Sequence, residues 1–138
     1  MTTPAPIYLD TSAVLRATLE SGTTREIEKS IAEAPMLITS RLSLVESARA
    51  FLRVRQIGKL SEARIADAER DVAILWRHCE LWEVTAVVCD LAQQIAPSRA
   101  LRTLDALHLA TFALARRKVA GLEMLTADER LRDAVNGL

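Results

Sequence analysis

The chain has few residues of the kinds that define small, specialised folds. It contains two cysteines, four glycines and four prolines among 138 residues, which is an ordinary globular composition. Only two histidines accompany the two cysteines, and their irregular spacing excludes a zinc framework. We therefore expect Cys79 and Cys89 to be buried free thiols rather than a disulfide, and the protein to be cytoplasmic.

The chain also lacks a net charge and a long hydrophobic run. Its 18 basic and 18 acidic side chains balance, so a nucleic-acid partner would have to bind at a local patch. The longest candidate membrane span, residues 106–115, is too short and contains His108 and Thr111. Met1–Pro6 has neither the basic nor the apolar region of a signal peptide. These absences predict a soluble protein with no membrane partner.

What the chain has is an alternation of short apolar runs and segments with helical periodicity. This pattern predicts an α/β fold, with one parallel sheet of four to five strands covered by helices. The expected domain spans residues 1–138, with a flexible terminus at 1–6, and the first helix ends at a turn over 21–23. Strands are predicted at 7–9, 36–39, 80–85 and 123–126. Helices are predicted at 13–19, 24–33, after 43 up to 57, 61–78, 86–96, 104–118 and 128–135.

The helix that ends at residue 57 has apolar residues at helical spacing. The predicted buried stripe consists of Leu44, Val45, Ala48, Phe51 and Leu52. This assignment would place Glu46 on the opposite side of the helix, beside Arg49 and Arg53.

Four acids stand out from the rest by their positions. Asp10 and Asp128 follow predicted strands, Glu46 follows another strand closely, and Asp105 lies in the first turn of the most apolar helix. Since the carboxyl ends of parallel strands meet at one edge of a sheet, these acids are expected to converge there. Each acid alone also has a simpler explanation, because acids in the first turn of a helix cap it or complement its dipole.

A set of converged carboxylates has limited chemical options. Carboxylates in one pocket repel one another, so either some take up protons or a cation neutralises them. Oxygen ligands without a His or Cys set favour Mg²⁺, or Mn²⁺, over zinc. Such an ion suits phosphodiester hydrolysis, because it can activate water and stabilise the leaving oxygen.

Four motifs in this order resemble the PIN-domain ribonucleases, and within them most closely the VapC-type toxins of toxin–antitoxin pairs. The motifs are Tyr8-Leu9-Asp10-Thr11-Ser12, Ser43-x-x-Glu46, Leu104-Asp105-Ala106-Leu107-His108-Leu109-Ala110 and Leu125-Thr126-Ala127-Asp128. The resemblance covers nearly the whole chain. It implies a single PIN-like domain and a magnesium-dependent endoribonuclease site.

Positions in the motifs imply roles for individual residues. Asp10 and Asp105 would be the main metal ligands, and Glu46 and Asp128 would complete the acidic quartet. Ser12 and Thr126 would support the site through hydrogen bonds. The resemblance also implies a homodimer, a cognate antitoxin that covers the site, and a structured RNA substrate such as tRNA or ribosomal RNA.

Other residues have both a functional and a structural interpretation. Arg49, Arg53, Arg99 and Arg102 are candidate contacts for RNA phosphates or members of a solvated face. His108 is a candidate general acid, although packing in the core is the favoured interpretation. Trp76 and Trp82 are expected to fill the core or a dimer interface.

Two other functional classes remain open from the sequence. A haloacid-dehalogenase-like phosphotransferase also begins with an acid after the first strand, but it needs a second Asp two residues later, where this chain has Ser12. A non-catalytic binding module with the same fold would bind no Mg²⁺ and cleave no RNA.

Overall fold

The centre of the computed structural model is a parallel sheet, and the structure describes residues 3–20 and 24–138. The strands in chain order are β1 (Ile7–Leu9), β2 (Leu37–Ser40), β3 (Cys79–Trp82) and β4 (Glu123–Leu125). Their order in space is β3-β2-β1-β4, so the first strand lies inside the sheet. The register aligns Tyr8 with Ile38 of β2 and Met124 of β4.

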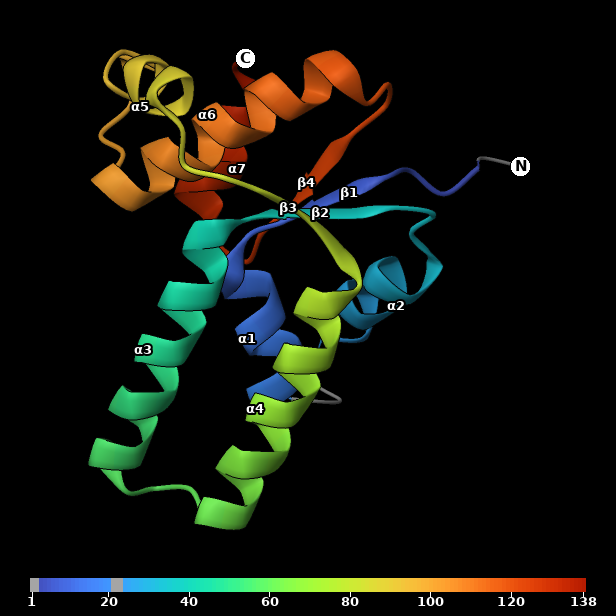
Figure 1. Cartoon of the computed structure of the whole chain (residues 1–138), viewed down its shortest axis with the longest axis vertical. Helices are drawn as coiled ribbons and strands as arrows, with labels where there is room; N and C mark the ends of the chain where they lie inside the picture. Colours follow the sequence, from blue (N-terminus) through green and yellow to red (C-terminus); the bar gives the residue numbers. More distant parts are fainter. Residues whose placement is uncertain (1–2, 21–23) are drawn as a thin grey trace.

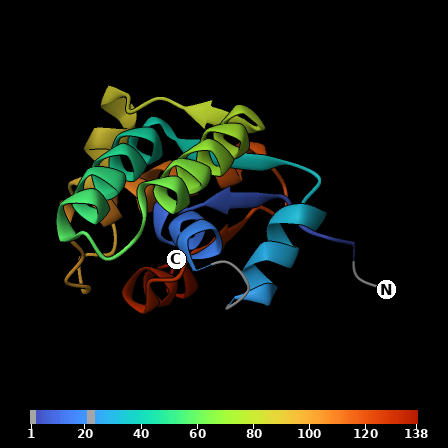
Figure 2. The same ribbon diagram turned by 90° about the horizontal axis from the view of Figure 1, so that it is seen from below.

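Helices cover both faces of the sheet. In chain order they are α1 (Thr11–Leu19), α2 (Arg25–Glu33), α3 (Arg41–Ile57), α4 (Glu62–Arg77), α5 (Ala86–Ala92), α6 (Thr103–Lys118) and α7 (Glu129–Asn136). Figure 1 shows α1 to α4 on one side of the sheet and α5 to α7 on the other. Figure 2, seen from below, shows α3 and α4 running side by side over their face. In the described part of the chain, no helix is long and apolar enough to cross a membrane.

Alternation along β1 divides the core into two clusters. Ile7 and Leu9 pack with Phe51 and other residues of α1, α3 and α4. Tyr8, which points the other way, packs with Leu109, Phe112 and other residues of α6 and α7. A strand buried on both faces needs a continuous apolar sequence, and β1 has one.

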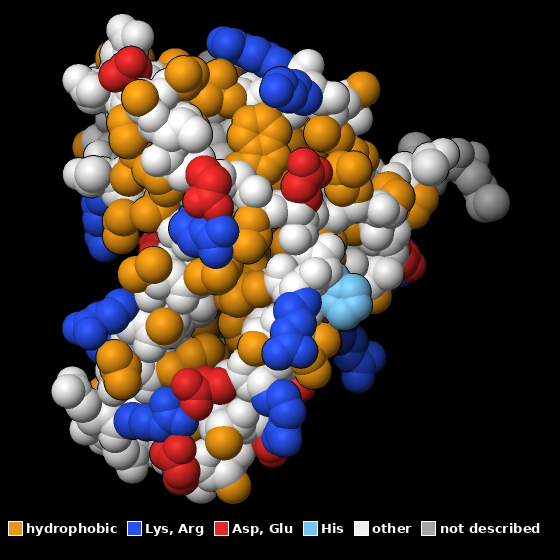
Figure 3. Space-filling view, viewed as in Figure 1, with side chains coloured by type: hydrophobic (Ala, Val, Ile, Leu, Met, Phe, Trp, Pro, Cys, Tyr) orange, Lys and Arg blue, Asp and Glu red, His pale blue; other side chains and the backbone are white. Residues whose placement is uncertain are grey.

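The arm formed by α3 and α4 has defined ends. Ser40 and Ser61 cap the two helices through their side chains. Gly58 ends α3 in the left-handed region at φ 72°, which a residue with a Cβ rarely adopts. Arg55 of α3 pairs with Glu62 and Glu69 of α4. Figure 3 shows charged side chains on this arm and hydrophobic side chains exposed between its two helices.

The predicted fold class is confirmed: in the described part of the chain the sheet has four strands, all of them parallel. Most predicted bounds agree with the structure within two residues. The larger differences are that α3 begins at Arg41 rather than after 43, β3 ends at Trp82 rather than 85, and α5 ends at Ala92 rather than 96. The chain leaves helical geometry after α5, and Ala96 has a φ of 49°. Both cysteines are free and half-buried. The predicted turn at 21–23, and residues 1 and 2 of the predicted flexible terminus, lie outside the described residues.

Candidate active site

The four acids lie where parallel topology predicts, at or near the carboxyl edge of the sheet. Asp10 follows β1, and Asp128 follows β4 after a short loop. Glu46 lies in the second turn of α3, the helix that leaves β2 directly. Asp105 is in the first turn of α6. Its pKa is raised by burial first and then by the charges of Asp128 and Asp10, so these three carboxylates share one electrostatic environment.

Asp10 is held by side-chain hydroxyls from two distant parts of the chain. It occupies the N-cap position of α1, yet its side chain makes no capping hydrogen bond. Instead, Oδ2 accepts hydrogen bonds from Ser12 Oγ at 2.5 Å and Thr126 Oγ1 at 2.7 Å. The carboxylate is buried. Helix capping therefore does not account for this acid.

The loop after β4 fixes the direction of these hydroxyls. The backbone N–H of Ala127 donates to Ser12 Oγ at 3.0 Å, and that of Asp128 donates to Thr126 Oγ1 at 3.0 Å. Each hydroxyl accepts from the backbone and is left to donate its own proton to Asp10. The loop and the carboxylate thus form one hydrogen-bonded unit.

Glu46 is held through one of its two oxygens. Oε1 accepts from Thr11 Oγ1 at 2.9 Å and is 2.5 Å from His108 Nε2. Burial favours a higher pKa for Glu46, but the hydrogen bond and charge of His108, with the bond from Thr11, lower it below its ordinary value. The cap of α3 is Ser40, so capping does not account for Glu46 either.

The predicted buried stripe of α3 is wrong in three positions. Val45, Ala48 and Leu52 are exposed, and Leu44 and Phe51 pack in the core. The inner face carries two serines in their place: Ser43 shares a hydrogen bond with Thr39, and Ser47 accepts one from the Trp76 indole. Hydroxyls with buried partners can replace apolar side chains on such a face. Glu46 therefore faces the site instead of solvent.

His108 is fully buried, as the packing interpretation predicts, but it also contacts the site. Its Nδ1 is 2.7 Å from the Tyr8 hydroxyl, and its Nε2 lies 3.8 Å from Asp10 Oδ1 as well as close to Glu46. Burial favours a lower pKa for His108, but the hydrogen bond to Glu46 and the charges of Asp10, Glu46 and Asp105 raise it. Two spacings in the sequence pointed to this contact. His108 follows Asp105 by about one helical turn, and Asp10 follows Tyr8 of β1 by two residues.

The shifted pKa values of His108 and Glu46 are expected to make the stability of the protein depend on pH. Because the pKa of His108 is raised, its stabilising contribution is full below 6.5 and is lost as pH rises through the raised value. The lowered pKa of Glu46 gives a contribution that is present above 4.5 and is lost on acidification. We expect the free energy of unfolding in urea to fall as the pH rises above 6.5, because the raised pKa of His108 is then passed, and to fall less in His108→Gln. An equal fall in the variant would contradict this assignment.

Capping does account for part of the Asp128 side chain. One oxygen, Oδ1, accepts from the backbone N–H groups of Arg130 and Leu131 at the start of α7. Among the described residues, no backbone N–H donates to the other oxygen. Asp128 therefore stabilises a helix and also contributes charge to the environment of Asp105.

The donor chemistry of the site fits a hard divalent cation. Within residues 3–20 and 24–138, no three His, Cys, Asp or Glu side chains are placed to hold a metal ion together. Magnesium, however, commonly binds one or two carboxylates and completes its octahedron with water and substrate phosphate. Asp10 and Asp105 could supply two such groups. A cation there would offset the carboxylate repulsion that, after burial, raises the pKa of Asp105.

Arginines line two pockets, one of which contains Glu46. A pocket of about 250 Å³ beside Glu46 is lined by Arg49, Arg53 and Leu104, among others. A second pocket, of about 350 Å³, is lined by Arg99, Arg130 and other residues, including the carboxylate of Asp133. Arg102 is the N-cap residue of α6, and its charge acts to lower the pKa of Asp105. The four arginines predicted from the sequence therefore divide between α3 and the segment before α6.

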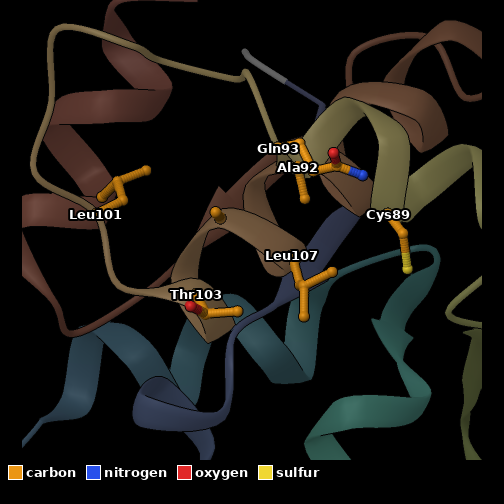
Figure 4. A pocket seen from close by; sticks show the side chains of 7 residues that line it. Cys89, Ala92, Gln93, Leu101, Thr103 and Leu107 are labelled. Carbon is orange, nitrogen blue, oxygen red and sulfur yellow. The ribbon is translucent and has the colours of Figure 1, made fainter.

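A pocket larger than these two, of about 480 Å³, lies elsewhere, between α5 and α6. Figure 4 shows Cys89 and Gln93 on one side of it and Leu101, Thr103 and Leu107 on the other. None of the four acids lines this pocket. Its size alone therefore does not identify the reactive site.

A parallel α/β fold with acids at the carboxyl edge of the sheet is the arrangement that the PIN-domain resemblance predicts. A comparison of the sequence with protein families agrees. The model of the PIN domain matches residues 7–136. The chain belongs to the PIN-domain family.

Within that family the chain is similar to proteins named as VapC ribonucleases. Ribonuclease VapC46 of Mycobacterium tuberculosis strain H37Rv is 36% identical over 135 residues, which are 97% of this chain and 93% of the relative. Ribonuclease VapC45 of strain CDC 1551 is 35% identical over 111 residues, 76% of this chain and 73% of the relative. The resemblance predicted from the four motifs is confirmed.

Solved structures share the fold at lower identity. PAE2754 from Pyrobaculum aerophilum superposes with a TM-score of 0.67 at 20% identity, covering 97% of this chain and 82% of the other. A toxin–antitoxin complex from Klebsiella pneumoniae gives a TM-score of 0.61 at 20% identity, with 88% and 86% covered. VapBC2 from Rickettsia felis, bound to a DNA fragment from its promoter, gives 0.58 at 11% identity, with 88% and 98% covered.

Proposed function

We propose that this protein is a magnesium-dependent endoribonuclease toxin that a cognate antitoxin neutralises. The observation that carries the proposal is the placement of the acids at the carboxyl edge of the sheet, where the buried carboxylate of Asp10 is held by the hydroxyls of Ser12 and Thr126. Burial, with the charges of Asp128 and Asp10, also raises the pKa of Asp105. The names of the relatives, which are ribonucleases, support RNA as the substrate. Asp10 and Asp105 would hold Mg²⁺, with Mn²⁺ as a substitute.

Different residues of the chain would have different roles in hydrolysis. When bound, the ion would supply positive charge beside the reacting phosphate. The Glu46 carboxylate, whose pKa is lowered, is ionised at neutral pH. An ionised carboxylate beside the attacking water can accept its proton. The water oxygen bonds to phosphorus, one ester P–O bond breaks, and the leaving oxygen takes a proton from solvent. Ser12 and Thr126 keep Asp10 in place throughout.

Ser12 also argues against phosphotransfer through an aspartyl-phosphate. Its hydroxyl donates a hydrogen bond to Asp10 at 2.5 Å, in the position where that chemistry needs a second acid. A hydroxyl cannot serve as the carboxylate acid and base of that reaction.

Chelation is the direct test of the proposal. The purified protein, incubated with total tRNA and ribosomal RNA, is expected to cut at discrete positions in Mg²⁺ or Mn²⁺ and to stop in EDTA. Addition of excess Mg²⁺ should restore cleavage, because the chelator removes the ion and leaves the fold intact. Full cleavage in EDTA would overturn the metal dependence. No cleavage of any RNA, together with no Mg²⁺ binding by calorimetry, would favour a binding module.

Arginines that line two pockets are candidate contacts for the phosphates of RNA. Arg49 and Arg53 line the pocket that contains Glu46, and Arg99 lines a second pocket with Arg130. No ion pair is formed by these arginines within the described part of the chain, so their charge is available to phosphates. Contacts of this kind would position the RNA backbone on the protein surface.

Removing one of these pairs should weaken binding without changing the chemistry. Arg49→Ala with Arg53→Ala is expected to raise KM for RNA, to leave kcat nearly unchanged, and to reduce the salt dependence of log K by about 2. Arg77→Ala, on an exposed position of α4, is the matched control. Unchanged KM and salt dependence in the double variant would exclude these arginines from the RNA path.

The proposed partners are an antitoxin and a second copy of the chain. Similarity to the toxin–antitoxin complex of Klebsiella pneumoniae and to VapBC2 supports an antitoxin. Exposed apolar side chains on α3, such as Val45 and Leu52, provide surface for such contacts. Co-purification with the protein encoded beside this one, and loss of cleavage in that complex, would identify the antitoxin. Sedimentation would give the oligomeric state.

A further inference from the structure

The hydrogen bonds to Glu46 are unequal at its two oxygens. Thr11 and His108 both bind Oε1, at 2.9 and 2.5 Å, and no hydrogen bond within the described part of the chain reaches Oε2. An ionised carboxylate can accept about four hydrogen bonds over its two oxygens. One oxygen is therefore fixed by the protein and the other is left for a ligand.

His108 is itself fixed from the other side. The Tyr8 hydroxyl lies 2.7 Å from Nδ1, and both rings are fully buried, with their centroids 5.9 Å apart and the planes at 76°. Phe112 packs edge-on against Tyr8 as well. A buried ring with partners at both nitrogens has one orientation, and so the direction of its Nε2–H bond is set by the core.

We propose that His108 is a positioning residue for the nuclease reaction: with Thr11 it fixes Glu46 through Oε1, so that Oε2 faces the attacking water. The inference rests on the proposed function, because it assigns a purpose to the way in which Glu46 is held. His108 touches neither RNA nor metal in this role. It acts through the carboxylate.

A free glutamate side chain has three rotatable bonds, and only a fraction of its rotamers would bring one oxygen to the water. Groups that orient a reacting ligand without touching the substrate commonly change activity by roughly 10–100-fold when removed. Misplacement of a catalytic group lowers the rate of the chemical step and leaves binding of distant parts of the substrate unchanged. The expected signature is therefore a fall in kcat with little change in KM for RNA.

Two amide substitutions of His108 separate positioning from packing. In His108→Gln the amide nitrogen takes the place of Nε2 and can donate to Glu46, whereas in His108→Asn the shorter amide reaches only the position of Nδ1, beside Tyr8. Both variants lose the ring, so a purely structural role predicts similar activities. Positioning predicts that kcat falls roughly 10–100-fold in His108→Asn and that His108→Gln recovers most of the loss.

Two variants of Thr11, the other donor to Glu46 Oε1, test the same role and leave His108 unchanged. Thr11→Ser keeps the hydroxyl, and Thr11→Val keeps the shape but cannot donate. The first is expected to retain kcat and the second to lower it. This pair decides the question if the His108 variants do not fold, which their thermal melting will show.

The outcomes also distinguish this inference from the proposed function. If the wild type cleaves RNA in Mg²⁺, and His108→Gln and His108→Asn have equal kcat while Thr11→Val matches Thr11→Ser, the positioning role is wrong and the nuclease stands. If the wild type cleaves no RNA under any condition, the proposed function fails first. A rise in KM at constant kcat in either pair would also overturn positioning, since it would indicate a role in RNA binding.

Discussion

Replacement of Asp105 by asparagine is expected to reduce RNA cleavage by roughly 10³-fold and to raise the melting temperature. The loss follows from the proposed metal site, because a ligand of a catalytic cation supports several kcal/mol of transition-state stabilisation. The gain in stability has an independent cause. Burial and the charges of Asp128 and Asp10 raise the pKa of Asp105, so its ionised form disfavours the folded state at neutral pH. A neutral amide removes that cost.

A loss of cleavage together with a rise in melting temperature would separate a role in the site from damage to the fold. Single-turnover cleavage of one RNA gives the rate, and calorimetry gives the melting temperature. Asp71→Asn, an exposed acid on α4, is the control and should change neither. Asp10→Asn is expected to lose cleavage to a similar extent. Full activity in Asp105→Asn would remove Asp105 from the site, and loss of activity with a lower melting temperature would indicate damage to the fold.

Phe112→Ala is expected to destabilise the protein by about 3–5 kcal/mol, whatever the protein's function. Phe112 is fully buried in the cluster that joins α6 to the sheet, and it packs edge-on against Tyr8 of β1. The substitution leaves a cavity that neighbouring helices can fill only in part. Since domains of this size are stable by only about 5–15 kcal/mol, the melting temperature should fall by roughly 10–20 °C.

Urea denaturation at constant pH measures this change directly. Val87→Ala on α5 is the control, since Val87 is 62% exposed and surface substitutions usually change stability by less than about 0.5 kcal/mol. A loss below about 1 kcal/mol in Phe112→Ala would mean that the second core cluster can close over the cavity.

The position of the acids at one edge of the sheet was predictable, because it follows from the parallel topology. Parallel strands bring their carboxyl ends together, so Asp10 and Asp128 could be placed at one edge from their positions after apolar runs. The raised pKa of Asp105 agrees with that placement. The order of strands could not be predicted, since short apolar strands carry no signal of which neighbour they pair with.

The orientation of α3 was not predictable from apolar spacing. Counting hydrophobic residues selects Val45 and Leu52, but burial of Ser43 and Ser47 depends on partners in β2 and α4 that are known only once the fold is formed. The same reason applies to His108. A histidine on an apolar helix is correctly assigned to the core, but its contact with Glu46 joins residues 62 positions apart.

The inner position of β1 in the sheet has a consequence for synthesis of the protein. One neighbour of β1 is β4, and the Thr126 hydroxyl that binds Asp10 comes from 116 residues further along the chain. Pairing over such a separation is slow and cannot begin until the later segment has left the ribosome. A nascent chain therefore carries Asp10 long before it can hold that carboxylate in place. For a protein whose proposed activity would harm the cell that makes it, this delay gives a partner time to bind before the enzyme is complete.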